Sequence, residues 1–284
     1  MVHRPLDREE YIEQAYCFRA FRERLEDNLP AQEILGGLSE ELLATTNVPK
    51  AMDFLRGEIL HNGRLSPGMA RLGHYFTPFQ TFVMSRAEEE RSRFDQKTAL
   101  MVLERLAEYL AGSPTAAGLF IYQFECVARN RLGYERGMKA IAADPFYDKP
   151  WRDWILKVRL RLGSTDFDQL IYYRSEQYVA ERRKRNPEYK PSYSILFGVR
   201  EGRIAKANRG KDPLYMFAAL QRQLGHPAVP RLRASNPAPI IHPALEQRLQ
   251  RIETRLKILD VESKGEFNLS EFYVKPEPIE PPVP

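Results

Sequence analysis

The chain has 284 residues, of which 43% are hydrophobic and 11% aromatic, enough to bury a core in one large domain or two small ones. Its only cysteines, Cys17 and Cys126, stand outside any CxxC pair, which excludes a disulfide framework and a cysteine-only zinc site. The net charge of +5 is uneven, because residues 1–111 hold 14 Lys and Arg against 18 Asp and Glu, whereas the remainder holds 29 against 20.

Hydropathy gives no indication of a membrane protein. The most apolar stretch, Ala116–Phe124, is short and contains Gln123. The first ten residues are rich in charged side chains, where a signal peptide requires an apolar run. We therefore expect a cytoplasmic protein with no membrane partner.

The first half of the chain reads as a series of helices. Apolar spacing predicts helices over residues 7–28 and 31–44. Three further helix starts are marked by a proline that follows a capping residue: Pro49, Pro67 and Pro78. Beyond Pro78 no Gly or Pro occurs up to Ala111, which predicts one long helix, although the polar stretch 88–97 leaves open a kink near Asp95.

Gly112, Ser113 and Pro114 mark a boundary where the charge balance changes sign. The sequence beyond it predicts a buried helix over residues 116–132, a short helix to about residue 143, and a helix that faces the core with Trp151 and Trp154. A further helix begins at Thr165 or Asp166. Residues 192–199 have strand-like composition, and residues 200–202 could turn the chain back toward residues 203–207, which predicts a small hairpin over 192–207. Asp212 and Pro213 begin a helix that Gly225 ends.

The C-terminal part has three segments. Five prolines over residues 226–243 indicate an extended linker. A heptad pattern over residues 244–262 then predicts an amphipathic helix, whose apolar seam is Leu245, Leu249, Ile252, Leu256 and Leu259. This seam fits a homodimer, a partner helix or packing on the protein's own body. Residues 263–284 form a short segment and a proline-rich tail that we expect to be disordered.

The segment 174–222 has the most distinctive chemistry in the chain. It holds twelve Lys and Arg against five Asp and Glu, a net charge of +7, and tyrosines and phenylalanines alternate with the cations. Cations interleaved with flat rings are typical of surfaces that bind nucleic acid. The candidate residues are a run and a row: Arg182, Arg183, Lys184 and Arg185; then Arg200, Arg203, Lys206, Arg209 and Lys211.

Each part of this segment also has a structural interpretation. The run at 182–185 precedes Asn186 and Pro187, so it also fits the last turn of a helix, where the dipole favours cations. The basic half also fits a face that packs against the acidic half. The glycines around Lys211 do not form a phosphate-binding loop, because Ala205 and Asp212 occupy the required Gly and Ser or Thr positions.

Catalytic motifs are weak. Glu58 and His61 form one Glu-x-x-His pair, the element that di-iron helical bundles use twice, and no second copy is present. The sequence contains no Gly-x-Ser-x-Gly nucleophile motif. We therefore expect no cofactor and assign no catalytic or metal-binding residue, with a metalloenzyme built on Glu58 and His61 as a minor alternative.

Together these patterns predict an all-α protein: a multi-helix globular body with at most one small β-hairpin over about 192–207, plus a C-terminal amphipathic helix. The expected divisions are an acidic helical half (1–111) continuous with a basic helical half (112–225), the linker 226–243, the heptad helix 244–262 and the tail 263–284. The leading hypothesis is a non-catalytic binding protein whose basic segment contacts nucleic acid or another polyanion. The alternative is a scaffold that acts through residues 245–259.

Overall fold

A computed structural model of the chain describes residues 5–89 and 94–231. The described residues contain helices and no β-strand, with two isolated bridges between Leu162 and Thr165 and between Ser175 and Phe197. The all-α prediction is confirmed for this part of the chain. The helices are α1 (Arg8–Glu26), α2 (Ala31–Glu41), α3 (Val48–Asn62), α4 (Ser66–Arg71), α5 (Pro78–Ala87), α6 (Gln96–Ala111), α7 (Ala116–Arg129), α8 (Tyr134–Ala142), α9 (Lys149–Arg161), α10 (Phe167–Tyr172), α11 (Glu176–Arg185), α12 (Val199–Ala207) and α13 (Pro213–Leu224).

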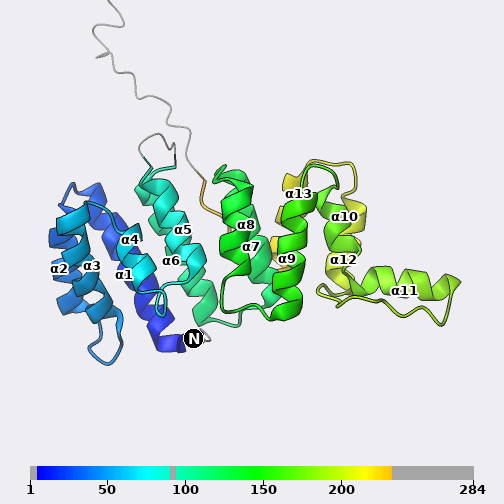
Figure 1. The fold of residues 1–284 in the computed structure, drawn as a ribbon, viewed down its shortest axis with the longest axis horizontal. Helices are drawn as coiled ribbons and strands as arrows, with labels where there is room; N and C mark the ends of the chain where they lie inside the picture. Colours follow the sequence, from blue (N-terminus) through cyan, green and yellow to red (C-terminus); the bar gives the residue numbers. More distant parts are fainter. Residues whose placement is uncertain (1–4, 90–93, 232–284) are drawn as a thin grey trace, which may run out of the picture. The chain divides into compact units, whose positions relative to one another are not determined.

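Residues 1–232 cluster as one compact unit, in which neighbouring helices pack along one another (Figure 1). In the first half α1 lies against α6, and α2 against α3. In the second half α7 packs on α8 and α13, and most of its residues are buried, as its unbroken apolar sequence predicts. None of the helices in the described ranges is long and apolar enough to cross a membrane.

An aromatic cluster joins the helices of the second half. Phe120 of α7 lies 4.8 Å from Trp154 of α9, measured between ring centroids. Phe124, one turn further along α7, stacks on Phe167 of α10 at 3.9 Å. Phe197 reaches the same cluster from the loop before α12, with its ring 5.3 Å from Trp154. These rings fix the position of α10, and of the chain at Phe197, against the core.

The long helix predicted from Pro78 to Ala111 is wrong in its continuous form. The chain forms α5 and α6 as separate helices, and the predicted break near Asp95 is where α6 begins. The Asp95 carboxylate accepts a hydrogen bond from the Thr98 backbone N–H, and Glu88 accepts two from the backbone at the start of α4. The polar residues between the two apolar stripes thus cap helix ends, which a continuous helix would not permit.

The predicted hairpin over residues 192–207 is also wrong. Residues 199–207 form α12, and Gly202, expected in or near a turn, lies inside this helix where it passes Ser175. Phe197 packs against the rings of both Trp151 and Trp154 and makes only an isolated bridge. The strand-like composition therefore reflects burial of one aromatic anchor and not strand pairing.

The first part of the predicted linker is packed against the body. Residues 226–231 are not helical but fold onto the body: His226, Val229 and Pro230 are buried. The Arg105 side chain donates to the carbonyl of Ala228, and Asn130 donates to that of Pro230. The rest of the linker, the heptad helix 244–262 and the tail 263–284 lie outside the described residues, so their assignment stays a prediction.

Candidate anion-binding site

The site is built by a sharp turn between α10 and α11. The sequence predicts one helix through this region, but α10 ends at Tyr172 and Ser175 caps α11. The buried Ser175 hydroxyl donates to the carbonyl of Tyr172 and accepts from the backbone N–H of Tyr178. The turn therefore places Tyr172 and Tyr178 on neighbouring elements, with their ring centroids 5.3 Å apart.

α11 extends away from the neighbouring helices, with Val179 as its only buried residue (Figure 1). Its base is held by the returning chain: the backbone N–H of Glu176 donates to the carbonyl of Phe197, and the carbonyl of Arg174 accepts from Leu196 and Phe197. Because Phe197 is anchored in the aromatic cluster, the start of α11 is fixed although most of the helix is exposed.

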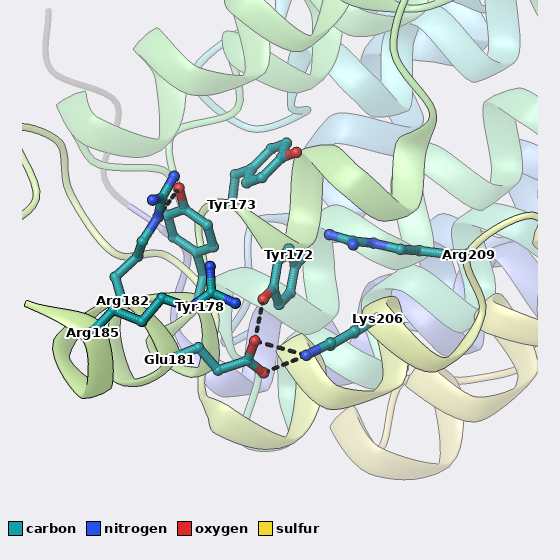
Figure 2. Close-up of a pocket in the computed structure, with 8 residues that line it drawn as sticks. All are labelled: Tyr172, Tyr173, Tyr178, Glu181, Arg182, Arg185, Lys206 and Arg209. Carbon is teal, nitrogen blue, oxygen red and sulfur yellow. Dashed lines mark hydrogen bonds and ion pairs between the residues drawn. The ribbon is translucent and has the colours of Figure 1, made fainter.

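A cavity of about 370 Å³ lies where α10, α11 and the end of α12 meet. Figure 2 shows its side chains, which form a tyrosine wall and a ring of cations around one carboxylate. The lining residues are Tyr172, Tyr173, Tyr178, Glu181, Arg182, Arg185, Lys206 and Arg209. Four cations against one carboxylate give the lining a net charge of +3.

Glu181 is the centre of a hydrogen-bonded cluster. Lys206 Nζ contacts both carboxylate oxygens, at 2.7 and 2.8 Å. Gln177 Nε2 and the Tyr172 hydroxyl each donate to the carboxylate at 2.7 Å. Bonding to Lys206, and then to Gln177 and Tyr172, lowers the pKa of Glu181 to about 2. The carboxylate is therefore ionised at neutral pH and neutralises Lys206.

The tyrosines hold two of the arginines by their ring faces. The guanidinium carbon of Arg209 lies 4.4 Å from the centroid of the Tyr172 ring. The guanidinium carbon of Arg182 lies 5.3 Å from the centroid of the Tyr178 ring, and Arg182 Nε donates to the Tyr178 hydroxyl at 2.9 Å. Burial raises the pKa of Tyr172 to about 12, so its phenol remains a hydrogen-bond donor at neutral pH. Such cation–π contacts orient an arginine without neutralising it.

The three arginines of this cavity have no carboxylate partner among the described residues. The ion pairs of this region join Glu181 to Lys206 and leave Arg182, Arg185 and Arg209 without one. In Figure 2 the guanidinium of Arg185 points toward the space between Tyr178 and Tyr172. Three guanidinium groups with unused N–H donors thus line one cavity, an arrangement suited to a multiply charged oxyanion.

The structure brings together only some of the residues selected from sequence. Arg182, Arg185, Lys206 and Arg209 share the cavity, and Lys211 lines a different hollow near Asp166 and Asp168. Arg183 donates to the carbonyl of Tyr189, and Arg203 donates to Gln177. Lys184 and Arg200 are exposed and line neither hollow. The row from Arg200 to Lys211 does not form a single surface, because its members face different partners.

Sequence reasoning missed two residues that organise the cavity. Tyr172 was not among the selected aromatics, and Glu181 counted only as one negative charge of the segment. No spacing rule identifies either, because their contact depends on the turn between α10 and α11. The signal that was available is Ser175, a capping residue three positions before Tyr178, which marks a new helix start.

The residues of the metalloenzyme alternative have other partners. Glu58 pairs with Arg71 at 2.5 Å, and His61 Nδ1 contacts the carbonyl of Gly57 at 2.8 Å. Within residues 5–89 and 94–231, no three His, Cys, Asp or Glu side chains cluster as metal ligands would.

Burial raises the pKa of Cys17 to about 12, so this thiol is protonated and unsuited to act as a nucleophile.

Comparison with protein-family models, with curated proteins and with solved structures found no match to this chain. The function proposed for the protein therefore depends on the geometry of the site.

Proposed function

We propose that this protein binds nucleic acid through the cavity between α11 and α12. One observation carries the proposal: Arg182, Arg185 and Arg209 line a single tyrosine-walled cavity and have no carboxylate partner among the described residues. Unneutralised arginines attract phosphate groups, and each contact releases counterions from the nucleic acid. Arg182 and Arg185 also lie in the last turn of α11, where the helix dipole favours cations, but that preference does not require them to share a cavity with Arg209.

The tyrosines favour a single strand over a duplex. Tyr173 is 43% exposed at the mouth of the cavity and offers an aromatic surface for an unstacked base. In a duplex the bases are paired and stacked, and a cavity of about 370 Å³ is too small to admit them. Each base that stacks on an aromatic side chain contributes about 1–3 kcal/mol to binding.

Fluorescence anisotropy with single-stranded and duplex oligonucleotides at two salt concentrations tests the proposal. The variant Arg182→Ala/Arg185→Ala/Arg209→Ala removes the three cavity arginines. The control Lys97→Ala/Lys157→Ala/Lys190→Ala removes the same charge at exposed positions outside the cavity. We expect the first variant to flatten the slope of log K against log salt by about 0.7 for each phosphate that the three arginines contact on a single strand.

The control variant should retain most of the wild-type slope. Absence of binding at low salt, or binding that does not respond to salt, would contradict the proposal. Equal losses of affinity in the two variants would also contradict it, because binding would then depend on total charge and not on the cavity.

A further inference from the structure

We infer that the cavity receives the terminal phosphate of a nucleic-acid strand, and not a phosphate within the strand. This inference rests on the proposed function and names the ligand group of the same site. It follows from three features of the cavity: how its charge is distributed, how its arginines are held, and how the surrounding cations are arranged.

The charge of the cavity exceeds what an internal phosphate would neutralise. Because Glu181 neutralises Lys206, the cations without an ion pair are Arg182, Arg185 and Arg209, of which Arg209 also interacts electrostatically with Asp168 without pairing with it. A phosphodiester carries one negative charge. A phosphomonoester carries about −1.5 to −2 at pH 7 and has three terminal oxygens, each able to accept from a guanidinium. Three arginines on one cavity therefore match a terminal phosphate better.

The arginines are oriented before a ligand arrives. Arg209 is held against the Tyr172 ring at 4.4 Å, and Arg182 against Tyr178 by its ring contact and the bond from Nε. The ring contacts cover one face of each guanidinium, and the bond to Tyr178 uses one N–H of Arg182. The other N–H groups remain available to a ligand. A group held this way loses little conformational entropy when it binds, so it favours a ligand of defined geometry.

Three other cations of the region are already bound to partners of their own, which reduces what a continuous strand could contact beyond the cavity. On α12, Arg203 is bonded to Gln177 and Lys206 to Glu181. On α11, Arg183 is bonded to the carbonyl of Tyr189. The cavity volume of about 370 Å³ lies in the range of small-molecule sites and suits one terminal nucleotide.

The test compares one single-stranded oligonucleotide in three forms: with a 5′-phosphate, with a 3′-phosphate, and with hydroxyls at both ends. Each carries the same internal fluorophore and is titrated with the full chain. We expect one phosphorylated form to bind roughly tenfold more tightly than the unphosphorylated strand. This preference should shrink below about pH 6, where the phosphate takes up its second proton.

Two variants locate the effect. Arg182→Ala/Arg185→Ala/Arg209→Ala should abolish the preference, and Lys97→Ala/Lys157→Ala/Lys190→Ala should keep it. The substitution Arg209→Lys retains the charge but removes the planar fork, and should reduce the preference severalfold without changing the salt dependence of the unphosphorylated strand. Far-ultraviolet circular dichroism checks that each variant is folded.

The outcomes separate this inference from the proposed function. Equal affinity for all three strands, weakened by the arginine variant, would overturn the terminal-phosphate inference and support nucleic-acid binding. A nucleoside monophosphate bound as tightly as the phosphorylated strand would support terminal-phosphate recognition and overturn a role in strand binding. No binding of any oligonucleotide or mononucleotide would overturn both, as would a stronger preference for a phosphotyrosine peptide.

Discussion

Glu181 has two opposing effects at the cavity. Its carboxylate orders Lys206, Tyr172 and Gln177, and the same charge repels any anion that enters. The carboxylate therefore lowers the affinity of the cavity for anions, and at the same time it fixes the positions of its three partners. This conflict makes Glu181 the most informative single position of the site.

The substitution Glu181→Gln should raise the affinity for single-stranded oligonucleotides about two- to fivefold and lower thermal stability. The amide keeps a hydrogen-bond acceptor but removes the repelling charge and leaves Lys206 unneutralised. Anisotropy titration and thermal unfolding measure the two effects. Glu176→Gln, on the exposed start of the same helix and outside the cavity, is the control and should change affinity much less. Unchanged or weaker binding by Glu181→Gln would contradict this role.

His226 should make stability depend on pH. It is buried, its Nε2 has no hydrogen-bond partner among the described residues, and burial lowers its pKa below 6.5. The unfolded chain therefore takes up a proton at higher pH than the folded protein. The stability conferred by the neutral ring is complete above about pH 6.5 and is lost as the pH falls toward the native pKa.

Thermal unfolding between about pH 7.5 and 5.5 measures this effect. His226→Phe should show a smaller decrease in Tm over this interval than the wild type. His61→Gln, at an exposed helix end, should behave like the wild type. Equal decreases in His226→Phe and the wild type would show that other groups cause the pH dependence.

At the scale of single residues, the sequence identifies charges well and their partners poorly. Arg182, Arg185, Lys206 and Arg209 could be selected because cation density is visible in one dimension. Which of them share a cavity depends on the turn at Ser175, and nothing in the spacing separates Arg182 from Arg183. The partners of a long side chain are set by the fold around it.

At the scale of elements, α11 and α12 meet at a point that tolerates no side chain. A Cβ on Gly202 would lie 2.2 Å from Ser175 Oγ and 2.7 Å from Gln177 Cβ. Ser175 is buried and its hydroxyl already bonds to the backbone at both sides of the turn, so it cannot move away at low cost. The approach of the two helices, and with it the cavity, depends on this glycine.

Gly202→Ala should therefore lower the free energy of unfolding by about 1–3 kcal/mol, because the helices must separate. It should also weaken oligonucleotide binding. Gly57→Ala is the matched control: Gly57 lies inside α3, and a Cβ added there would meet no atom within 4 Å, so the same substitution should stabilise by about 0.5–1 kcal/mol. Denaturant unfolding measures both. A neutral Gly202→Ala would show that α11 adjusts freely against α12.

Helix starts were predicted more reliably than helix breaks. Thr77 with Pro78 and Asp212 with Pro213 begin α5 and α13 as the sequence indicates, because capping is a local property. The helical state of residues 199–207 depends on distant partners, namely the tryptophans against which Phe197 packs. Local composition cannot contain that information.

At the scale of the whole molecule, contacts cross the boundary at Gly112 from several directions. The fully buried Tyr122 of α7 donates to the carbonyl of Val102 in α6 at 2.8 Å. Arg136 of α8 forms an ion pair with Glu89 at 3.0 Å, and Arg105 donates to the carbonyl of Ala228. The change of charge at this boundary therefore does not coincide with a gap in packing, and residues 1–232 cluster together. We expect the two halves to unfold as one.

Two optical signals can test this, because both tryptophans, Trp151 and Trp154, lie in the second half, whereas helical circular dichroism reports on both halves. In denaturant the two curves should coincide. Tyr122→Phe leaves the Val102 carbonyl without this bond and should lower stability by about 1–3 kcal/mol. The midpoints of the fluorescence and circular dichroism curves should shift equally. The substitution weakens the contact between α6 and α7, and a single cooperative unit unfolds as a whole. Tyr16→Phe, which loses an exposed bond to Glu41, should shift neither. Separation of the two curves, in the wild type or in Tyr122→Phe, would show that the acidic and basic halves are independent folding units.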